Sequence, residues 1–386
     1  MKSLQLILSN KRYFSIVWVF SSLNIMIGTW VLYIPQVKVK LQLDDSQIGF
    51  VLFCLALGLL FFIPVVPIVT KKIGLGKCTF FGICIFSIAF IGPLIAPTYI
   101  MLCASLFLVG IFSGLTDIAM NTVVSEIEKV DSVNFMSAAH GFFSLGGAIG
   151  ALVGSVLIGV FDSPLYHVMI MTTFVIITNL LLFGQYFNIR EVEEASEEKQ
   201  KLPMKLLKPL MILGFLAMVI MGNEGAIEHW SSIYLTEVVK VSSENLAGLG
   251  FTVFSITMTI GRFFGDGISA KIGSAKIVIL GCSFAALGYV FVLFNGLLLS
   301  VLGFGIIGLG LSVIVPELMR IAGNTKGIVA SKSISFVSGV GFVGFLVGPV
   351  ILGYISDSFS LKMSYVFLLS ITLIATCIAT FKLKTR

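Results

Sequence analysis

Two stretches of this sequence decide its fold: GAIGALVGSVLIG at residues 147–159 and GFVGFLVGPVILG at residues 341–353. Four glycines occupy the same places in both, and each glycine of the second stretch lies 194 positions after its counterpart in the first. The remaining residues are almost all apolar, as in membrane helices that pack closely through small residues. The chain therefore contains an internal repeat of one set of helices. Duplicated sets of membrane helices are typical of secondary transporters, which bind their solute between the sets.

The composition is that of an integral membrane protein. Hydrophobic residues make up 57% of the chain and charged residues 11%, with a mean hydropathy of +1.07. A soluble domain needs more charge to cover its surface. A helix needs about 20 apolar residues to cross the hydrocarbon core. Twelve runs of suitable length are present, at about 12–34, 46–70, 78–96, 99–123, 134–161, 166–188, 209–236, 245–270, 275–294, 297–319, 328–356 and 361–382.

The repeat divides the twelve helices into two pseudo-symmetric six-helix bundles. We expect an N-terminal bundle over 1–188, a charged cytoplasmic linker over 189–208 and a C-terminal bundle over 209–386. The linker is interpreted as a tether between the bundles, and a docking site for a regulatory partner is the alternative. The predicted fold class is an all-α membrane protein with twelve transmembrane helices.

The net charge of +6 follows membrane topology and does not indicate nucleic-acid binding. With the N-terminus inside, most of the 25 lysines and arginines fall on or near the cytoplasmic side. Four fall outside: Lys38, Lys40, Lys240 and Lys362. This asymmetry is the positive-inside rule, and it predicts that both the N- and the C-terminus are cytoplasmic.

The sequence offers no pattern that indicates catalysis or a bound cofactor. The six cysteines stand singly within the apolar runs, without the spacing of a metal site or a disulfide framework. No nucleophile–base pair and no cluster of metal ligands is visible. We therefore expect a protein that is not an enzyme and that has no catalytic residue, metal or cofactor.

Ionisable residues inside a span are costly, so each is a candidate functional residue. Asp117 lies on a polar stripe of the fourth run with Ser113 and Asn121. It is interpreted as a proton- or solute-binding group, with a structural bond to a neighbouring helix as the alternative. In the seventh run, Glu224 and Glu228 share one helix face, where two ionised carboxylates repel. One of them then holds a proton part of the time, which suits a proton carrier.

Amides, histidines and aromatic rings in the spans are the candidate contacts of the solute. Rings pack on the C–H faces of sugars and amides bind their hydroxyls. The candidates are Asn24, Trp30, Tyr33, Asn121, His140, Asn223 and His229. Some have a second interpretation: Trp30 and Tyr33 as anchors at the membrane interface, Glu228 and His229 as water-facing groups, and His140 as a local hydrogen-bonding group.

A second charged group is predicted near the cytoplasmic ends of the eighth and tenth runs. Arg262 and Asp266 stand four residues apart and either neutralise each other or latch onto Glu317 and Arg320. We expect these four residues to serve in gating or in structure rather than in contact with the solute.

Five segments carry a resemblance to a known family: GLTDIAMN (114–121), MSAAHGFFSLG (136–146), EGAIEHWSSIYL (224–235), GRFFGD (261–266) and GFLVGP (344–349). They resemble the major facilitator superfamily, and within it the bacterial permeases related to the proton-coupled fucose permease. The resemblance implies the major facilitator fold and an acid four residues before an Asn in the fourth helix, matched here by Asp117 and Asn121. It also implies an acid in the first helix where Val31 stands, so either proton coupling is absent or Glu224 takes that role.

The sequence thus predicts a proton-coupled, alternating-access carrier of a small polar, sugar-like solute. We expect a multi-pass monomer in the bacterial cytoplasmic (inner) membrane, with the solute, protons and the lipid bilayer as partners and no nucleic acid. Two alternatives stay open. An efflux antiporter for amphipathic or drug-like compounds would use the 34 Phe and 14 Met residues for an adaptable pocket. A non-transporting membrane sensor would bind a solute without moving it.

Overall fold

The computed structural model describes residues 2–158, 160–161, 163–190, 204–325 and 330–383. Within these ranges, twelve helical segments are long and apolar enough to cross a membrane. The predicted fold class, an all-α protein with twelve transmembrane helices, is confirmed. The boundaries of the two bundles stay a prediction, because residues 191–203 of the charged linker lie outside the described residues.

We call the helices before residue 190 the N-terminal half. Its spans are built from α2 (Lys11–Val31), α4 (Asp45–Phe62), α6 (Leu75–Ala89) with α7 (Ile91–Ile95), α8 (Tyr99–Asp131), α9 (Met136–Leu157) and α10 (Pro164–Leu182). The shorter helices of this half are α1 (Lys2–Ser9), α3 (Ile34–Leu41), α5 (Val66–Ile73) and the 3₁₀ turn η1 (Phe183–Gln185).

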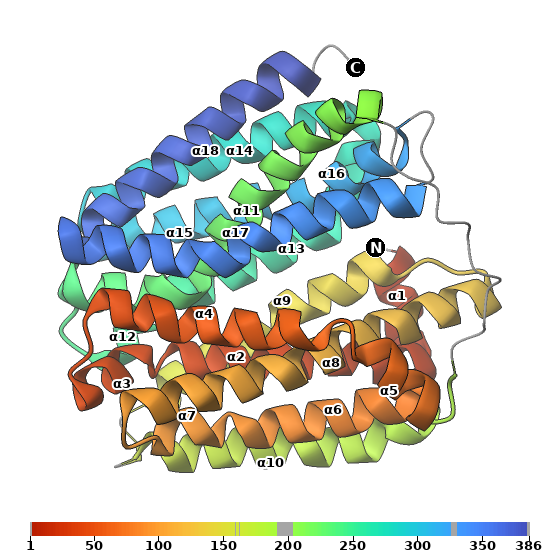
Figure 1. Ribbon diagram of the computed structural model, residues 1–386, viewed down its shortest axis with the longest axis horizontal. Helices are drawn as coiled ribbons and strands as arrows, with labels where there is room; N and C mark the ends of the chain where they lie inside the picture. Colours follow the sequence, from red (N-terminus) through yellow and green to blue (C-terminus); the bar gives the residue numbers. More distant parts are fainter. Residues whose placement is uncertain (1, 159, 162, 191–203, 326–329, 384–386) are drawn as a thin grey trace.

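The C-terminal half follows the linker. Its spans are built from α11 (Met204–Glu237), α12 (Glu244–Ala247) with α13 (Leu249–Ile272), α14 (Ser274–Leu293), α15 (Leu297–Leu311) with α16 (Ile314–Gly323), α17 (Ala330–Ser358) and α18 (Leu361–Leu383). In Figure 1, α1 and the C-terminal end of α18 lie at one end of the molecule, and α3 and α12 lie at the other. We call these the terminal end and the distal end.

Two helix ends differ clearly from the prediction. The second apolar run extends to about residue 70, whereas α4 ends at Phe62 and α5 follows from Val66. The fourth apolar run ends near residue 123, yet α8 continues to Asp131. The extra turns are polar, and an ion pair between Lys129 and Glu126 supports them at i,i+3 spacing. The helix stops at Ser132, which adopts the left-handed conformation with φ of 53°. The hydropathy of the sequence therefore predicts which part of a helix lies in the membrane, but it does not predict where the helix ends.

The two glycine stretches pack equivalent pairs of helices. In the N-terminal half, a Cβ atom added to Gly150 of α9 would lie 2.3 Å from the carbonyl oxygen of Ile25 in α2. In the C-terminal half, a Cβ atom added to Gly344 of α17 would lie 1.9 Å from the carbonyl oxygen of Met218 in α11. The same close backbone contact is therefore made twice. Gly159, the last glycine of the first stretch, lies outside the described residues.

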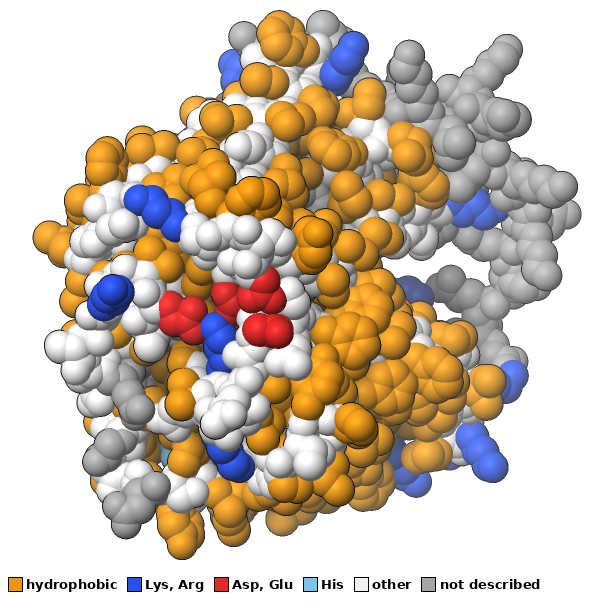
Figure 2. All heavy atoms as spheres, turned by 60° about the vertical axis from the view of Figure 1, so that its left-hand side comes forward, with side chains coloured by type: hydrophobic (Ala, Val, Ile, Leu, Met, Phe, Trp, Pro, Cys, Tyr) orange, Lys and Arg blue, Asp and Glu red, His pale blue; other side chains and the backbone are white. Residues whose placement is uncertain are grey.

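Charged residues join the two halves at the distal end. Lys38 donates hydrogen bonds to Asp45 and, over 2.5 Å, to Glu237 of the C-terminal half. Asp357 of α17 accepts hydrogen bonds from the backbone N–H groups of Asp45 (3.0 Å) and Ser46 (2.8 Å), at the first turn of α4. A carboxylate is favoured there by the positive end of the helix dipole. We call Lys38, Asp45, Glu237 and Asp357 the distal clamp, and Figure 2 shows acidic side chains gathered on this face.

The close helix contact at Gly344 yields a first prediction. Gly344→Ala should lower the free energy of unfolding by about 1–3 kcal/mol, because the added methyl group overlaps the backbone of α11. Gly339→Ala is the matched control on the same helix, since a Cβ atom there meets nothing within 4 Å. Thermal unfolding of the purified protein measures both. Equal losses of stability in the two variants would contradict the packing argument.

The distal clamp yields a second prediction. Burial by itself lowers the pKa of Lys38, but its hydrogen bonds to Asp45 and Glu237 raise that pKa above its usual value. The clamp should therefore stabilise the fold fully below the ordinary pKa of lysine and weaken as the pH rises through the raised pKa. Lys38→Met should cost about 1–3 kcal/mol at neutral pH, because it leaves the buried Asp45 carboxylate without its cation.

Melting temperatures measured from neutral to strongly alkaline pH test this prediction. Lys40→Met is the control, because Lys40 donates to the carbonyl oxygen of Leu94 within the N-terminal half. The prediction fails if Lys38→Met and Lys40→Met lose the same stability, or if the melting temperature of Lys38→Met falls with pH as steeply as that of the unmodified chain.

Candidate functional site

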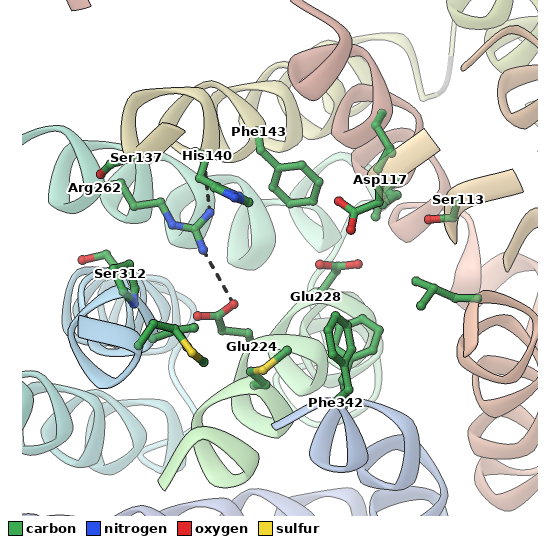
Figure 3. Close-up of a pocket in the computed structure, with 18 of the residues that line it drawn as sticks. Ser113, Asp117, Ser137, His140, Phe143, Glu224, Glu228, Arg262, Ser312 and Phe342 are labelled. Carbon is green, nitrogen blue, oxygen red and sulfur yellow. Dashed lines mark hydrogen bonds and ion pairs between the residues drawn. The ribbon is translucent and has the colours of Figure 1, made fainter. Parts of the chain in front are cut away.

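A cavity of about 520 Å³ lies between the two halves. Helices α2, α4, α8 and α9 of one half and α11, α13, α16 and α17 of the other contribute to its walls. Its lining reaches Met136 and Met319 toward the terminal end and Trp30 and Glu228 toward the distal end. The volume falls in the range of small-molecule sites. Figure 3 shows side chains from both halves pointing into this space.

The cavity brings together eight of the residues that the sequence indicated. Four are carboxylic acids, two are histidines, and the other two are a tryptophan and an arginine. They are Asp117, Glu224, Glu228, His140, His229, Trp30, Arg262 and Glu317. Polar groups inside a membrane protein are costly, so their collection around one cavity marks it as the candidate site.

Asp117 enters the cavity from α8, in the N-terminal half (Figure 3). The Nδ2 of Asn121 donates to the Asp117 carboxylate over 3.2 Å and to the Asp117 backbone carbonyl over 2.8 Å. The spacing of four residues places both side chains on one helix face. Asn121 does not line the cavity, so its contribution is to hold the carboxylate of Asp117 in position.

Arg262 connects the halves across the middle of the cavity. Its Nη2 lies 3.7 Å from Oε2 of Glu224, on the same half, and the pair is drawn in Figure 3. Its Nη1 donates to the carbonyl oxygen of His140 (3.2 Å) and to Oγ of Ser144 (2.5 Å), both on α9 of the other half. The guanidinium therefore neutralises one acid while it binds the opposite half.

The described contacts place one member of the predicted latch, Arg262. Arg262 pairs with Glu224 and not with Glu317, whose carboxylate is 2.9 Å from Nη1 of Arg320 on its own helix. The side chain of Asp266 lies outside the described residues. Sequence spacing suggested a partner one turn away on the same helix, whereas packing brings the carboxylate of α11 to Arg262.

Glu228 and His229 lie on α11, toward the distal end of the cavity. Oε1 of Glu228 is 3.6 Å from Nε2 of His229, and the His229 side chain is 3% exposed. The Nδ1 of His229 and the Nε1 of Trp30 have no hydrogen-bond partner among the described residues. Glu228 and His229 both line the cavity, so neither simply faces bulk water at an outer surface.

Three other predicted contacts lie away from the cavity and bond within the fold. Asn24 donates to the carbonyl oxygen of Phe143 over 2.9 Å, and the hydroxyl of Tyr33 lies 2.8 Å from Nδ1 of the buried His167. Asn223 is fully buried and accepts a hydrogen bond from Tyr289. Internal hydrogen bonds of this kind join membrane helices.

Sequence reasoning missed three serines of the site, Ser137, Ser144 and Ser312, because single serines in a span carry no distinctive pattern.

Comparison with known proteins identifies the family. The model of the Major Facilitator Superfamily matches residues 14–325 and 241–386. The chain belongs to the major facilitator superfamily. Membership and the twelve apolar helices make it a multi-pass transporter of the bacterial inner membrane and not an enzyme.

Several superfamily members are similar to it over most of their length. An uncharacterised MFS-type transporter of Yersinia pestis is 29% identical over 341 residues, covering 88% of this chain and 87% of that protein. The membrane protein MosC of Rhizobium meliloti is 26% identical over 361 residues, covering 93% and 87%. An uncharacterised transporter of Sinorhizobium fredii is 27% identical over 349 residues, covering 89% and 90%.

Solved structures of two superfamily transporters share the fold. The nucleoside transporter NupG superposes with a TM-score of 0.73 at 15% identity, covering 97% of this chain and 99% of that one. A bacterial homologue of the human lysosomal transporter Spinster, in an inward-facing and occupied conformation, gives 0.70 at 13% identity, covering 97% and 96%. At these identities the likeness shows the fold alone.

The pair at the centre of the cavity yields a third prediction. Arg262→Gln should cost about 2 kcal/mol of stability, because it leaves the Glu224 carboxylate without its cation and removes the bonds to α9. The double variant Arg262→Gln/Glu224→Gln should recover part of that loss, since no charge is then stranded. The double-mutant cycle compares thermal unfolding of the unmodified chain, Arg262→Gln, Glu224→Gln and the double variant. Losses that simply add would show that the two side chains do not interact.

Proposed function

We propose that this transporter couples the proton gradient to the movement of a small polar, sugar-like solute by alternating access. The supporting observation is the cavity between the halves, in which three of the four carboxylic acids come from two helices of opposite halves. Asp117 comes from α8, and Glu224 and Glu228 come from α11. Acids that face a cavity can exchange protons with water that enters it, and a solute bound there contacts both halves at once.

The two halves are the moving bodies in this proposal, with the boundaries 1–188 and 209–386 and both termini in the cytoplasm. Two observations favour the assignment of the present structure to an inward-facing state. The distal clamp holds the halves together at the distal end. The cavity lining reaches the first turn of α9 at Met136, close to the terminal end. The excess of positive charge near the terminal end supports its cytoplasmic position.

Asp117 is the proposed proton carrier. Its recorded partner is an amide, Asn121, whereas Glu224 already has a guanidinium beside it. The charged and titratable groups that share its cavity come from other helices: His140 from α9, Glu224, Glu228 and His229 from α11, Arg262 from α13 and Glu317 from α16. A proton on Asp117 would remove one of the negative charges in this space. Glu224 supports the scheme as a second acid, because its Oε1 has no hydrogen-bond partner among the described residues.

The rest of the lining supports a sugar-like solute. Aromatic rings offer flat apolar faces, and hydroxyl groups offer both donors and acceptors. The rings belong to Trp30, Phe90, Phe143, Phe342 and Phe345, and the hydroxyls to Ser113, Ser137 and Ser312. The same rings, together with Met136, Met221 and Met319, also favour a second candidate function, which is efflux of amphipathic cations. Increased sensitivity of a deletion strain to lipophilic cations would favour that candidate.

The role of Asp117 yields a fourth prediction. Asp117→Asn should abolish accumulation of solute against its gradient and leave exchange of solute intact, because the amide binds polar groups but carries no proton. The measurement uses proteoliposomes with an imposed pH gradient and a radiolabelled sugar selected by thermal-shift screening. Asp117→Glu is the matched control and should keep part of the accumulation. Full accumulation by Asp117→Asn would exclude Asp117 as the proton carrier.

A further inference from the structure

The distal end of the cavity contains hydrogen-bonding groups that the fold itself leaves unpaired. Trp30 and His229 are each 3% exposed. Neither Nε1 of Trp30 nor Nδ1 of His229 has a hydrogen-bond partner among the described residues, and both side chains line the cavity. Buried polar groups in proteins are nearly always paired, so two enclosed and unpaired nitrogen atoms on residues that line one cavity call for an explanation, and a bound polar ligand is one.

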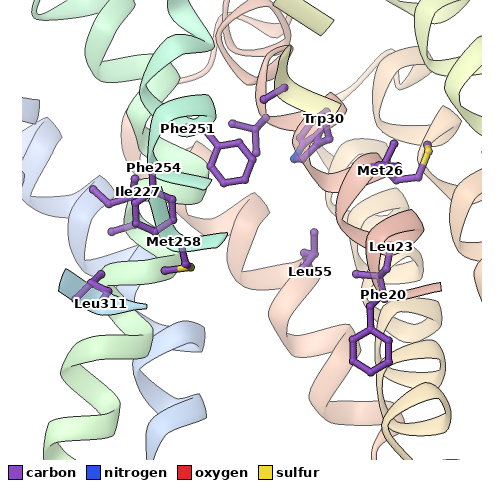
Figure 4. Packing of buried hydrophobic residues seen from close by; sticks show 14 of the residues in the cluster. Phe20, Leu23, Met26, Trp30, Leu55, Ile227, Phe251, Phe254, Met258 and Leu311 are labelled. Carbon is purple, nitrogen blue, oxygen red and sulfur yellow. The ribbon is translucent and has the colours of Figure 1, made fainter. Parts of the chain in front are cut away.

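These groups and Glu228 belong to one place in the fold. The hydroxyl of Ser232 on α11 donates to the carbonyl oxygen of Val31 at the end of α2, over 2.9 Å. Trp30 is the residue before Val31, and Glu228 lies one turn before Ser232 on the same face of α11. Both therefore flank the point at which α2 and α11 meet. Figure 4 shows Trp30 at the border of the N-terminal half, across from side chains of the C-terminal half.

In the described part of the chain, the acids of this corner outnumber its cation, because the one guanidinium of Arg262 acts on both Glu224 and Glu228. The guanidinium of Arg262 pairs with Glu224 and with oxygens of α9. Among the described residues, Glu228 forms no ion pair with a lysine or arginine, and its recorded contact is His229 at 3.6 Å. The Glu228 side chain is 15% exposed, so an ionised carboxylate here has little water to stabilise it. It needs either a proton or a cation.

We propose that this corner binds a protonated amine with a neighbouring hydroxyl group, and that the solute is an amino sugar. An ammonium group has three donors and no acceptor, which suits the Glu228 carboxylate. The indole N–H of Trp30 is a donor without acceptor capacity, so it requires an oxygen such as a sugar hydroxyl. The indole face also attracts a cation. This inference rests on the proposed function, because it names the solute class of the same carrier.

Sets of related sugars that differ in charge test the inference. The probes are glucosamine, galactosamine and mannosamine, each with its neutral parent sugar and its N-acetyl derivative, at a pH where the amines are protonated. The readout is the melting temperature of the purified full-length chain, which rises when a ligand binds the folded state. We expect at least one hexosamine to raise it, and we expect its N-acetyl derivative and parent sugar to bind at least about tenfold more weakly.

Variants assign the effect to the corner. Glu228→Gln should abolish the shift produced by the hexosamine, since the amide carries no negative charge. Trp30→Phe keeps a ring and removes the donor, so it should weaken binding of the hexosamine by about tenfold or less. Glu126→Gln is the control: it also removes a buried acid of a spanning helix, but Glu126 pairs with Lys129 and does not line the cavity.

The outcomes separate this inference from the proposed function. Neutral sugars that bind as tightly as the amines, or a hexosamine shift that persists in Glu228→Gln, would overturn the amine site and leave a sugar carrier in place. If neither amines nor neutral sugars bind, both the amine site and the sugar-like solute are wrong. The comparison of amine with N-acetyl derivative uses the unmodified chain, so it decides the question even if a variant fails to fold.

Discussion

A charged group in a membrane protein must find its partner inside the protein, and this constraint determines how the two halves meet. Arg262 satisfies it by reaching across the interface, with Glu224 on one side and oxygens of α9 on the other. Hydrocarbon offers no alternative partner, so the polar groups of both halves collect where the halves face each other. The cavity and its acids follow from that arrangement.

Close glycine contacts and charged side chains both hold the helices of this protein together. Within each half, glycines bring helix backbones together, as at Gly150 and Gly344, and such contacts resist any change of spacing. Between the halves, the distal clamp stands beside further glycine contacts, since a Cβ atom added to Gly49 of α4 would lie 2.5 Å from the carbonyl oxygen of Pro349 in α17. The Lys38 and Asp45 side chains are 12% and 10% exposed and the Glu237 side chain is 39% exposed, so water can most easily replace the contact to Glu237. A rocking carrier would have to separate both the glycine contacts and the charged pairs at the distal end.

The sequence predicted the features that depend on spacing along one helix. The repeated glycines, the twelve spans and the stripe that joins Asp117 to Asn121 all belong to this class. It could not predict which face of a helix meets a cavity and which meets a neighbour. Asn223 and Glu224 are adjacent in sequence, yet Asn223 bonds to Tyr289 in the packed interior while Glu224 lines the cavity. The partner of Arg262 was missed for the same reason, because it lies on another helix.

The central claim is that the halves rock about the cavity, and distances at the two ends test it most directly. Spin labels at residues 39 and 359 report on the distal end, and labels at 130 and 324 report on the terminal end; all four positions are exposed. The distances should be measured in proteoliposomes with and without an imposed proton gradient. Alternating access predicts that one distance lengthens while the other shortens. Two distances that stay constant, or that change in the same direction, would contradict the account.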